Sequence, residues 1–150
     1  MPGSSTLRVV VAASVAAVCS GAPSTAHAVL TCRDPLAAAR AAGTLLPGRR
    51  DRPALVPGIA VHLAVTAWWT AVLAAVDRRH RLGVLGGAAA GALIAALDLE
   101  ILGRTHPAIQ ALPRFPQWLD HLAFGAIIGA LLPAPTDPAR SRAPALGDRS

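Results

Sequence analysis

The chain has 150 residues, of which 53% are hydrophobic and 15% are charged, and its formal net charge is +6. So apolar a composition in one short domain is typical of an integral membrane protein and differs from that of a water-soluble domain. All the basic residues are arginines, and they lie between the apolar segments without interleaved aromatic residues. This pattern argues against nucleic acid as a partner, indicates the lipid bilayer instead, and suggests a GC-rich bacterial genome.

The first apolar run covers residues 9–30, and two interpretations of it are open. A basic lead, an apolar stretch and an A-x-A sequence at 26–28 are typical of a cleaved signal peptide. The run also has the roughly 20 residues that a retained membrane span needs. Its small residues have the four-residue spacing of a helix contact: Ala13, Ala17 and Gly21. Because the same helix would carry a polar stripe that includes His27, we expect residues 1–28 to be retained as part of the first span.

Three further apolar segments follow, separated by prolines and charged residues. Each is predicted to be a membrane-crossing helix: 55–76, 83–103 and 117–132. Asp34 and Pro35 are typical of a helix start and predict a short helix at the membrane interface over about 35–46. Residues 134–150 lack an apolar face and are predicted to be disordered. The predicted fold class is therefore all-α, a four-helix transmembrane bundle in one domain, 1–133, with a short interfacial helix and a disordered C-terminal tail.

The arginines also bear on the orientation of the chain. Antiparallel spans divide them equally between the two sides of the membrane, so their total number does not decide the orientation. Short loops weigh most in the positive-inside rule, and the turn at 78–81 is both short and basic. We therefore expect this turn and both termini to be cytoplasmic, in a multi-pass protein of the cell (inner) membrane.

Ionisable side chains are predicted to gather at one depth in the membrane. At about 1.5 Å per residue, antiparallel spans place them within about 5–10 Å of the same surface. Charged groups at this depth are costly and usually find partners inside a bundle. Glu100 is expected to point away and to pair with Arg104, four residues later. We name the remaining set the polar layer: His27, His62, Asp98, Asp120 and His121.

Three roles are open for the polar layer. In the first, each group hydrogen-bonds a neighbour and fixes the helix register, so the protein is a structural or interaction protein. In the second, His62, Asp98 and His121 relay protons in a small carrier or proton-conducting protein. In the third, the imidazoles and a carboxylate bind a divalent metal such as zinc, although ligands on separate helices have no diagnostic spacing. We favour the first role and predict no enzyme, no catalytic residue, no metal and no cofactor, since the sequence has no H-E-x-x-H, G-x-S-x-G or Walker motif.

Glycines recur at four-residue spacing in the third and fourth predicted spans. This spacing is typical of helices whose backbones approach closely. The predicted helix-packing residues are Gly83, Gly87, Gly91, Gly125 and Gly129. The same glycine faces are also expected to support a homo-oligomer.

The segment from Gly58 to Leu132 resembles a known group of membrane proteins. It contains GIAVHL near the start of one span, an acidic glycine-rich span, a proline-containing linker, and then WLDHLAFGAIIG. This arrangement is similar to that of small bacterial membrane proteins of unassigned function, and distantly to the YagU-like inner-membrane proteins. These also carry a histidine opening one span and a His-Leu pair in the last, although their long linker is much shorter here. The resemblance implies a multi-pass topology and carries no catalytic residues over to this chain.

Overall fold

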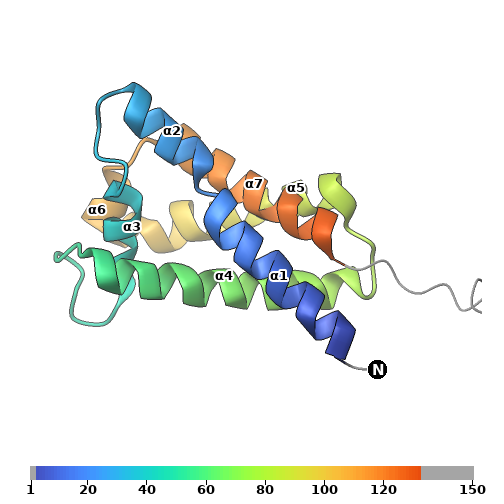
Figure 1. Ribbon diagram of the computed structural model, residues 1–150. Helices are drawn as coiled ribbons and strands as arrows, with labels where there is room; N and C mark the ends of the chain where they lie inside the picture. The colour runs from blue at the N-terminus through green and yellow to red at the C-terminus, as the bar shows by residue number, and fades with distance from the viewer. Residues whose placement is uncertain (1–2, 133–150) are drawn as a thin grey trace, which may run out of the picture.

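The computed structural model describes residues 3–132, and every regular element in this part of the chain is helical (Figure 1). The predicted disordered tail, 134–150, lies outside the described residues. The elements in chain order are α1 (Gly3–Cys19), α2 (Ala22–Leu30), α3 (Ala37–Ala42), η1 (Gly43–Leu45), α4 (Leu55–Asp77), α5 (Gly83–Ala95), η2 (Ala96–Leu102), η3 (Gly103–Thr105), α6 (Pro107–Gln110) and α7 (Arg114–Leu131).

In the part of the chain that the structure describes, three helical segments are long and apolar enough to cross a membrane. They are Thr6–Leu30, Leu55–Asp77 and Gly83–Thr105. The all-helical fold and the membrane-capable helices are thus confirmed. The fourth predicted span, 117–132, coincides with α7, which is a single helix with Arg114, Asp120 and His121 in its N-terminal half. That α7 also crosses the membrane stays a prediction.

The first apolar segment is broken into α1 and α2 near Gly21. Pro23 has no N–H with which to continue the helical hydrogen bonds, so α1 ends at Cys19 and α2 starts at Ala22. α1 packs against α4 and α7. The stripe of small residues that it buries is Ala12, Ala16 and Ser20. The predicted stripe, Ala13, Ala17 and Gly21, is therefore wrong by one residue.

α5 and α7 form the most extensive helix pair in the described part of the chain. A Cβ added to Gly87 would overlap the carbonyl oxygen of Gly125, and one added to Gly125 would overlap that of Gly87. A Cβ on Gly91 would likewise overlap the carbonyl of His121, and one on Gly129 that of Gly83. The two backbones are therefore in direct contact, and the glycine faces of α5 and α7 cover each other within one chain. The predicted homo-oligomer stays a prediction.

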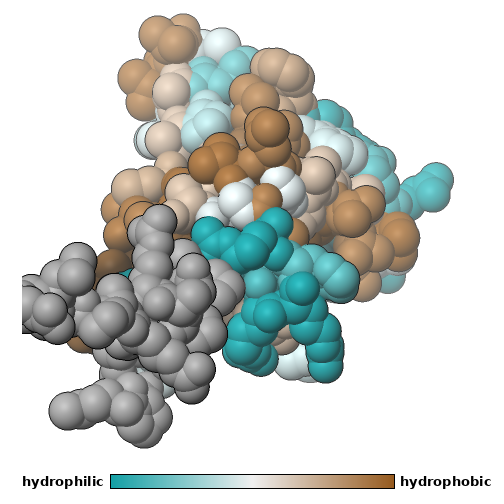
Figure 2. Space-filling model, turned by 90° about the vertical axis from the view of Figure 1, so that its right-hand side faces the viewer, coloured by the Kyte–Doolittle hydropathy of each residue, from teal (hydrophilic) through white to brown (hydrophobic). Residues whose placement is uncertain are grey.

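α4 and α5 are consecutive but pack mainly against different partners. α4 contacts α1, α3 and η1, whereas α5 contacts α7. The turn between them is held by Asp77, whose Oδ1 accepts a hydrogen bond of 2.9 Å from the Leu82 N–H and whose Oδ2 lies 4.0 Å from Nη1 of Arg81. The arginines of this turn are exposed. Figure 2 views this end of the molecule and shows a hydrophilic patch beside hydrophobic surface.

A short helix forms where 35–46 was predicted to be helical. It is split into α3 and the 3₁₀ turn η1, and it packs against the start of α4. The contact is close, because a Cβ on Gly58 would overlap the carbonyl oxygen of Ala39. Thr44 in η1 is fully buried and donates a hydrogen bond of 2.7 Å to the carbonyl of Ala41. Its position at a membrane interface stays a prediction.

The third predicted span is not one regular α-helix. α5 ends at Ala95, and residues Ala96–Leu102 (η2) form a π-helix, followed by the 3₁₀ turn η3. In a π-helix each N–H bonds the carbonyl five residues back, which changes the phase of the side chains that follow. π-helical turns occur frequently at functional sites. Here the segment contains both carboxylates of the span, Asp98 and Glu100.

Candidate functional site

Asp98 and His121 form the closest contact within the polar layer. Asp98 lies in the π-helix η2 and His121 lies in the second turn of α7. Oδ2 of Asp98 is 3.6 Å from Nε2 of His121, and each side chain is 21% exposed. The close glycine contact between α5 and α7 brings the two residues together, since the carbonyl of His121 itself lies against Gly91.

The second ring nitrogen of His121 determines what this pair can do. Nδ1 lies 2.8 Å from the carbonyl oxygen of Gln117. A carbonyl oxygen only accepts, so Nδ1 carries a proton and donates it. Nε2 therefore faces the Asp98 carboxylate either as a lone pair or with a second proton. The pair is attractive only when it holds that additional proton, on the imidazole or on the carboxyl group.

Asp120 has a different partner, although it is adjacent to His121 in the sequence. Its Oδ1 accepts a hydrogen bond of 2.9 Å from the backbone N–H of Ser24, in the first turn of α2. The first N–H groups of any helix lack a partner inside that helix, and a carboxylate there also interacts favourably with the helix dipole. Asp120 thus caps α2 from α7.

His62 of α4 makes the corresponding contact with the end of α1. Its Nε2 lies 3.0 Å from the carbonyl oxygen of Ala17. Because this oxygen can only accept, Nε2 is the protonated nitrogen. Ala17 is in the last turn of α1, where carbonyl groups lack partners inside the helix. His62 and Asp120 therefore bond the two sides of the same helix break.

His27 lies apart from these contacts. It is half-buried on α2 and lines a small cleft of about 100 Å³ between α2, α3 and the start of α7. Asp34 and Gln117 also line this cleft. The structure thus pairs Asp98 with His121, places His62 and Asp120 at the helix break, and places His27 in a separate cleft.

Glu100 forms its ion pair with Arg114, and the expected partner Arg104 is only a more distant electrostatic neighbour. Its Oε1 lies 2.5 Å from Nη1 of Arg114 at the start of α7. Residues two apart in an α-helix point about 200° apart, yet both Asp98 and Glu100 reach α7. The π-helical winding of η2 changes the direction of the Glu100 side chain, and the long side chain of Arg114 spans the remaining distance. The expectation failed because it assumed a regular α-helix through this segment.

Several partners in the site could not be found from residue types. The acceptors and donors at the helix break are the backbone carbonyl of Ala17 and the backbone N–H of Ser24. The only sequence signal for them was the Gly21–Pro23 pair, which indicates a break but not what covers it. Among residues 3–132 no group of three or more His, Cys, Asp or Glu side chains is arranged to hold a metal ion.

Comparison with family models, with curated proteins and with solved structures gives no match to this chain. The resemblance to YagU-like proteins therefore stays a prediction. Within residues 3–132 the structure defines an all-helical fold with three helices long and apolar enough to cross a membrane.

Proposed function

We propose that the protein is an integral multi-pass membrane protein with a structural or interaction role, in which the polar layer holds the helices together. The observation that carries this proposal is the double contact at the break between α1 and α2. His62 bonds the Ala17 carbonyl before the break, and Asp120 bonds the Ser24 N–H after it. Both polar side chains thus satisfy backbone groups that the break leaves open.

The membrane environment explains why such contacts are needed. In hydrocarbon no water is available to backbone groups, and each unsatisfied N–H or C=O costs several kcal/mol. A break inside the first span exposes groups of this kind, so partners from neighbouring helices are the physical solution. The ionisable residues are then part of the architecture and need no substrate to account for them.

The test compares stability with transport in matched variants. We expect His62→Ala and Asp120→Ala to lower the midpoint of thermal unfolding in detergent. His62→Gln and Asp120→Asn keep a donor and an acceptor, respectively, and should recover much of the loss. Purified protein in liposomes should conduct protons no faster than empty liposomes. If both alanine variants melt like the wild type, the structural role of these contacts is refuted.

A second function is favoured by a specific feature, the Asp98–His121 pair. This pair attracts only with an added proton, as a proton-relay site requires. On α4, Thr66 and Thr70 continue from His62 at four-residue spacing and are buried, and Thr70 Oγ1 has no hydrogen-bond partner among the described residues. A proton-conducting protein or small carrier would use His62, Asp98 and His121, and the two threonines extend the polar face of α4 beyond His62.

Proton flux separates the two functions. A carrier requires pH-driven flux in liposomes containing the wild type, and loss of that flux in Asp98→Asn with unchanged unfolding. Flux equal to that of empty liposomes would exclude it. A flux that survives Asp98→Asn unchanged would show that this pair is not the path.

A further inference from the structure

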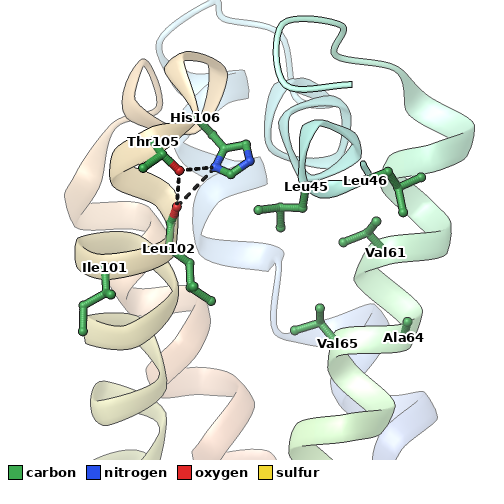
Figure 3. A pocket seen from close by; sticks show the side chains of 9 residues that line it. All are labelled: Leu45, Leu46, Val61, Ala64, Val65, Ile101, Leu102, Thr105 and His106. Atoms are coloured by element: carbon green, nitrogen blue, oxygen red, sulfur yellow. Dashed lines mark hydrogen bonds between the residues drawn. The ribbon is translucent and has the colours of Figure 1, made fainter. Parts of the chain in front are cut away.

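The separation of α4 from η2 leaves an apolar groove between them. It has a volume of about 580 Å³ and is open to the surroundings along one side. Its walls are Val61, Ala64 and Val65 of α4 on one side and Ile101 and Leu102 of η2 on the other, as Figure 3 shows. Leu45, Leu46, Thr105 and His106 surround its upper end in that view. A groove of this size is comparable to a small-molecule site, and its lining is almost entirely hydrocarbon.

No arginine among the described residues lines the groove itself, but Arg50 bonds a residue at the end of the groove where Thr105 lies. Nε of Arg50 donates a hydrogen bond of 2.5 Å to the carbonyl oxygen of Thr105, which fixes one guanidinium group at the rim. Arg49 follows Leu46 in a turn closed by an Arg49 N–H to Leu46 C=O bond of 3.1 Å. Nε of Arg49 is buried and has no hydrogen-bond partner among the described residues. A buried guanidinium N–H without an acceptor is costly, and an anion placed there would supply one.

The local charge is strongly positive. Arg49, Arg50 and Arg52 share one loop, Arg104 precedes Thr105, and Asp51 is the only carboxylate in the loop. An apolar groove that ends in a cluster of arginines is complementary to a molecule with a hydrocarbon chain and an anionic head. Guanidinium groups at such a site can donate charge-assisted hydrogen bonds to a lipid phosphate.

We propose that this groove binds an anionic phospholipid, with one acyl chain between α4 and η2 and the phosphate at Arg49 and Arg50. This inference rests on the proposed interaction role in the membrane and names the partner. The Arg50–Thr105 hydrogen bond joins the loop before α4 to the end of η3. A lipid in the groove would add a second link between the same two parts of the chain, α4 with its preceding loop and η2 with η3.

Native mass spectrometry of the full chain in detergent tests the proposal. Dioleoyl phosphatidylglycerol and dioleoyl phosphatidylcholine share acyl chains and differ in net charge. We expect one phosphatidylglycerol to be retained in preference to phosphatidylcholine. An arginine near anionic lipid contributes about fivefold in affinity, so Arg49→Gln/Arg50→Gln should weaken binding by about 25-fold. Arg78→Gln/Arg79→Gln, at the other end of α4, is the matched control and should bind like the wild type.

The groove is tested separately from the charge. Ala64→Phe fills it and should abolish the preference for phosphatidylglycerol, whereas Ala71→Phe, exposed on the same helix but outside the groove, should not. Equal retention of both lipids, or equal loss in the two double-arginine variants, would overturn the proposal. Thermal unfolding with added ligand gives a further test. If inorganic phosphate protected the protein from unfolding as well as the lipid does, the site would bind a free anion and the proposal would be overturned. Carbonate extraction of membranes separates this inference from the proposed function. If the wild type resists extraction but shows no lipid preference, only this inference is refuted. If carbonate releases the protein, the membrane-integral function itself is refuted.

Discussion

Gly87 of α5 and Gly125 of α7 touch backbone to backbone, so that a Cβ on either residue would overlap the carbonyl oxygen of the other. Without this contact Asp98 and His121 would not lie within 3.6 Å of each other, because the same helix pair carries both. The glycines therefore set the geometry of the polar contacts as well as the packing.

Substitution at this contact should be strongly destabilising. We expect Gly87→Ala to lower the free energy of unfolding by about 1–3 kcal/mol, the usual cost of overpacking, because the clash is with backbone that cannot rotate away. Gly86→Ala is the control, since its Cβ would meet only the Leu82 side chain at 3.5 Å. Unfolding in detergent measures both. Equal stability of the two variants would contradict a direct backbone contact between α5 and α7.

Removal of the Asp120 carboxylate should loosen α2. We expect Asp120→Ala to cost about 0.5–2 kcal/mol, as for other helix caps, because the Ser24 N–H loses its acceptor. Asp120→Asn keeps an oxygen acceptor and should be the milder change. Hydrogen exchange of the Ser24 amide reports the effect locally and should accelerate in the alanine variant. An unchanged exchange rate there would exclude the cap.

The Asp98–His121 contact should depend on pH. A double-mutant cycle with Asp98→Asn and His121→Gln measures the coupling between the two side chains. An imidazole that already donates through Nδ1 attracts a carboxylate only after Nε2 is also protonated. The coupling should therefore be stabilising near pH 5.5 and decrease toward pH 9. A coupling that is constant over this range would show that the contact is not an ion pair in either state.

The N-terminal helix should be retained in the mature protein. Ala12 and Ala16 are fully buried in a core with Leu73, Phe124 and Ile128, and the Ala17 carbonyl accepts the His62 hydrogen bond. Loss of residues 1–28 would expose this core and leave both contacts at the helix break without partners. The intact mass of the purified protein tests this, and a species that begins at Val29 would contradict it.

Local sequence patterns were sufficient to predict the helical segments and their apolar character. Composition and run length are local properties, so the three membrane-capable helices, the short helix before α4 and the interruptions at prolines could be predicted from them. The four-residue glycine spacing also indicated close helix contact, because a stripe of glycines can serve little else inside an apolar helix.

Which polar groups meet depends on how the helices pack against one another. His62 and Asp120 bond backbone atoms, which every residue possesses and no sequence pattern marks. Glu100 reaches Arg114 and not Arg104 because η2 winds as a π-helix, and one additional residue per turn changes the phase of every side chain that follows. His27 faces the cleft between α2, α3 and the start of α7, which Asp34 also lines, and has no part in the contacts at the helix break. These are consequences of how helices are wound and packed together, and helical periodicity within one segment contains no information about them.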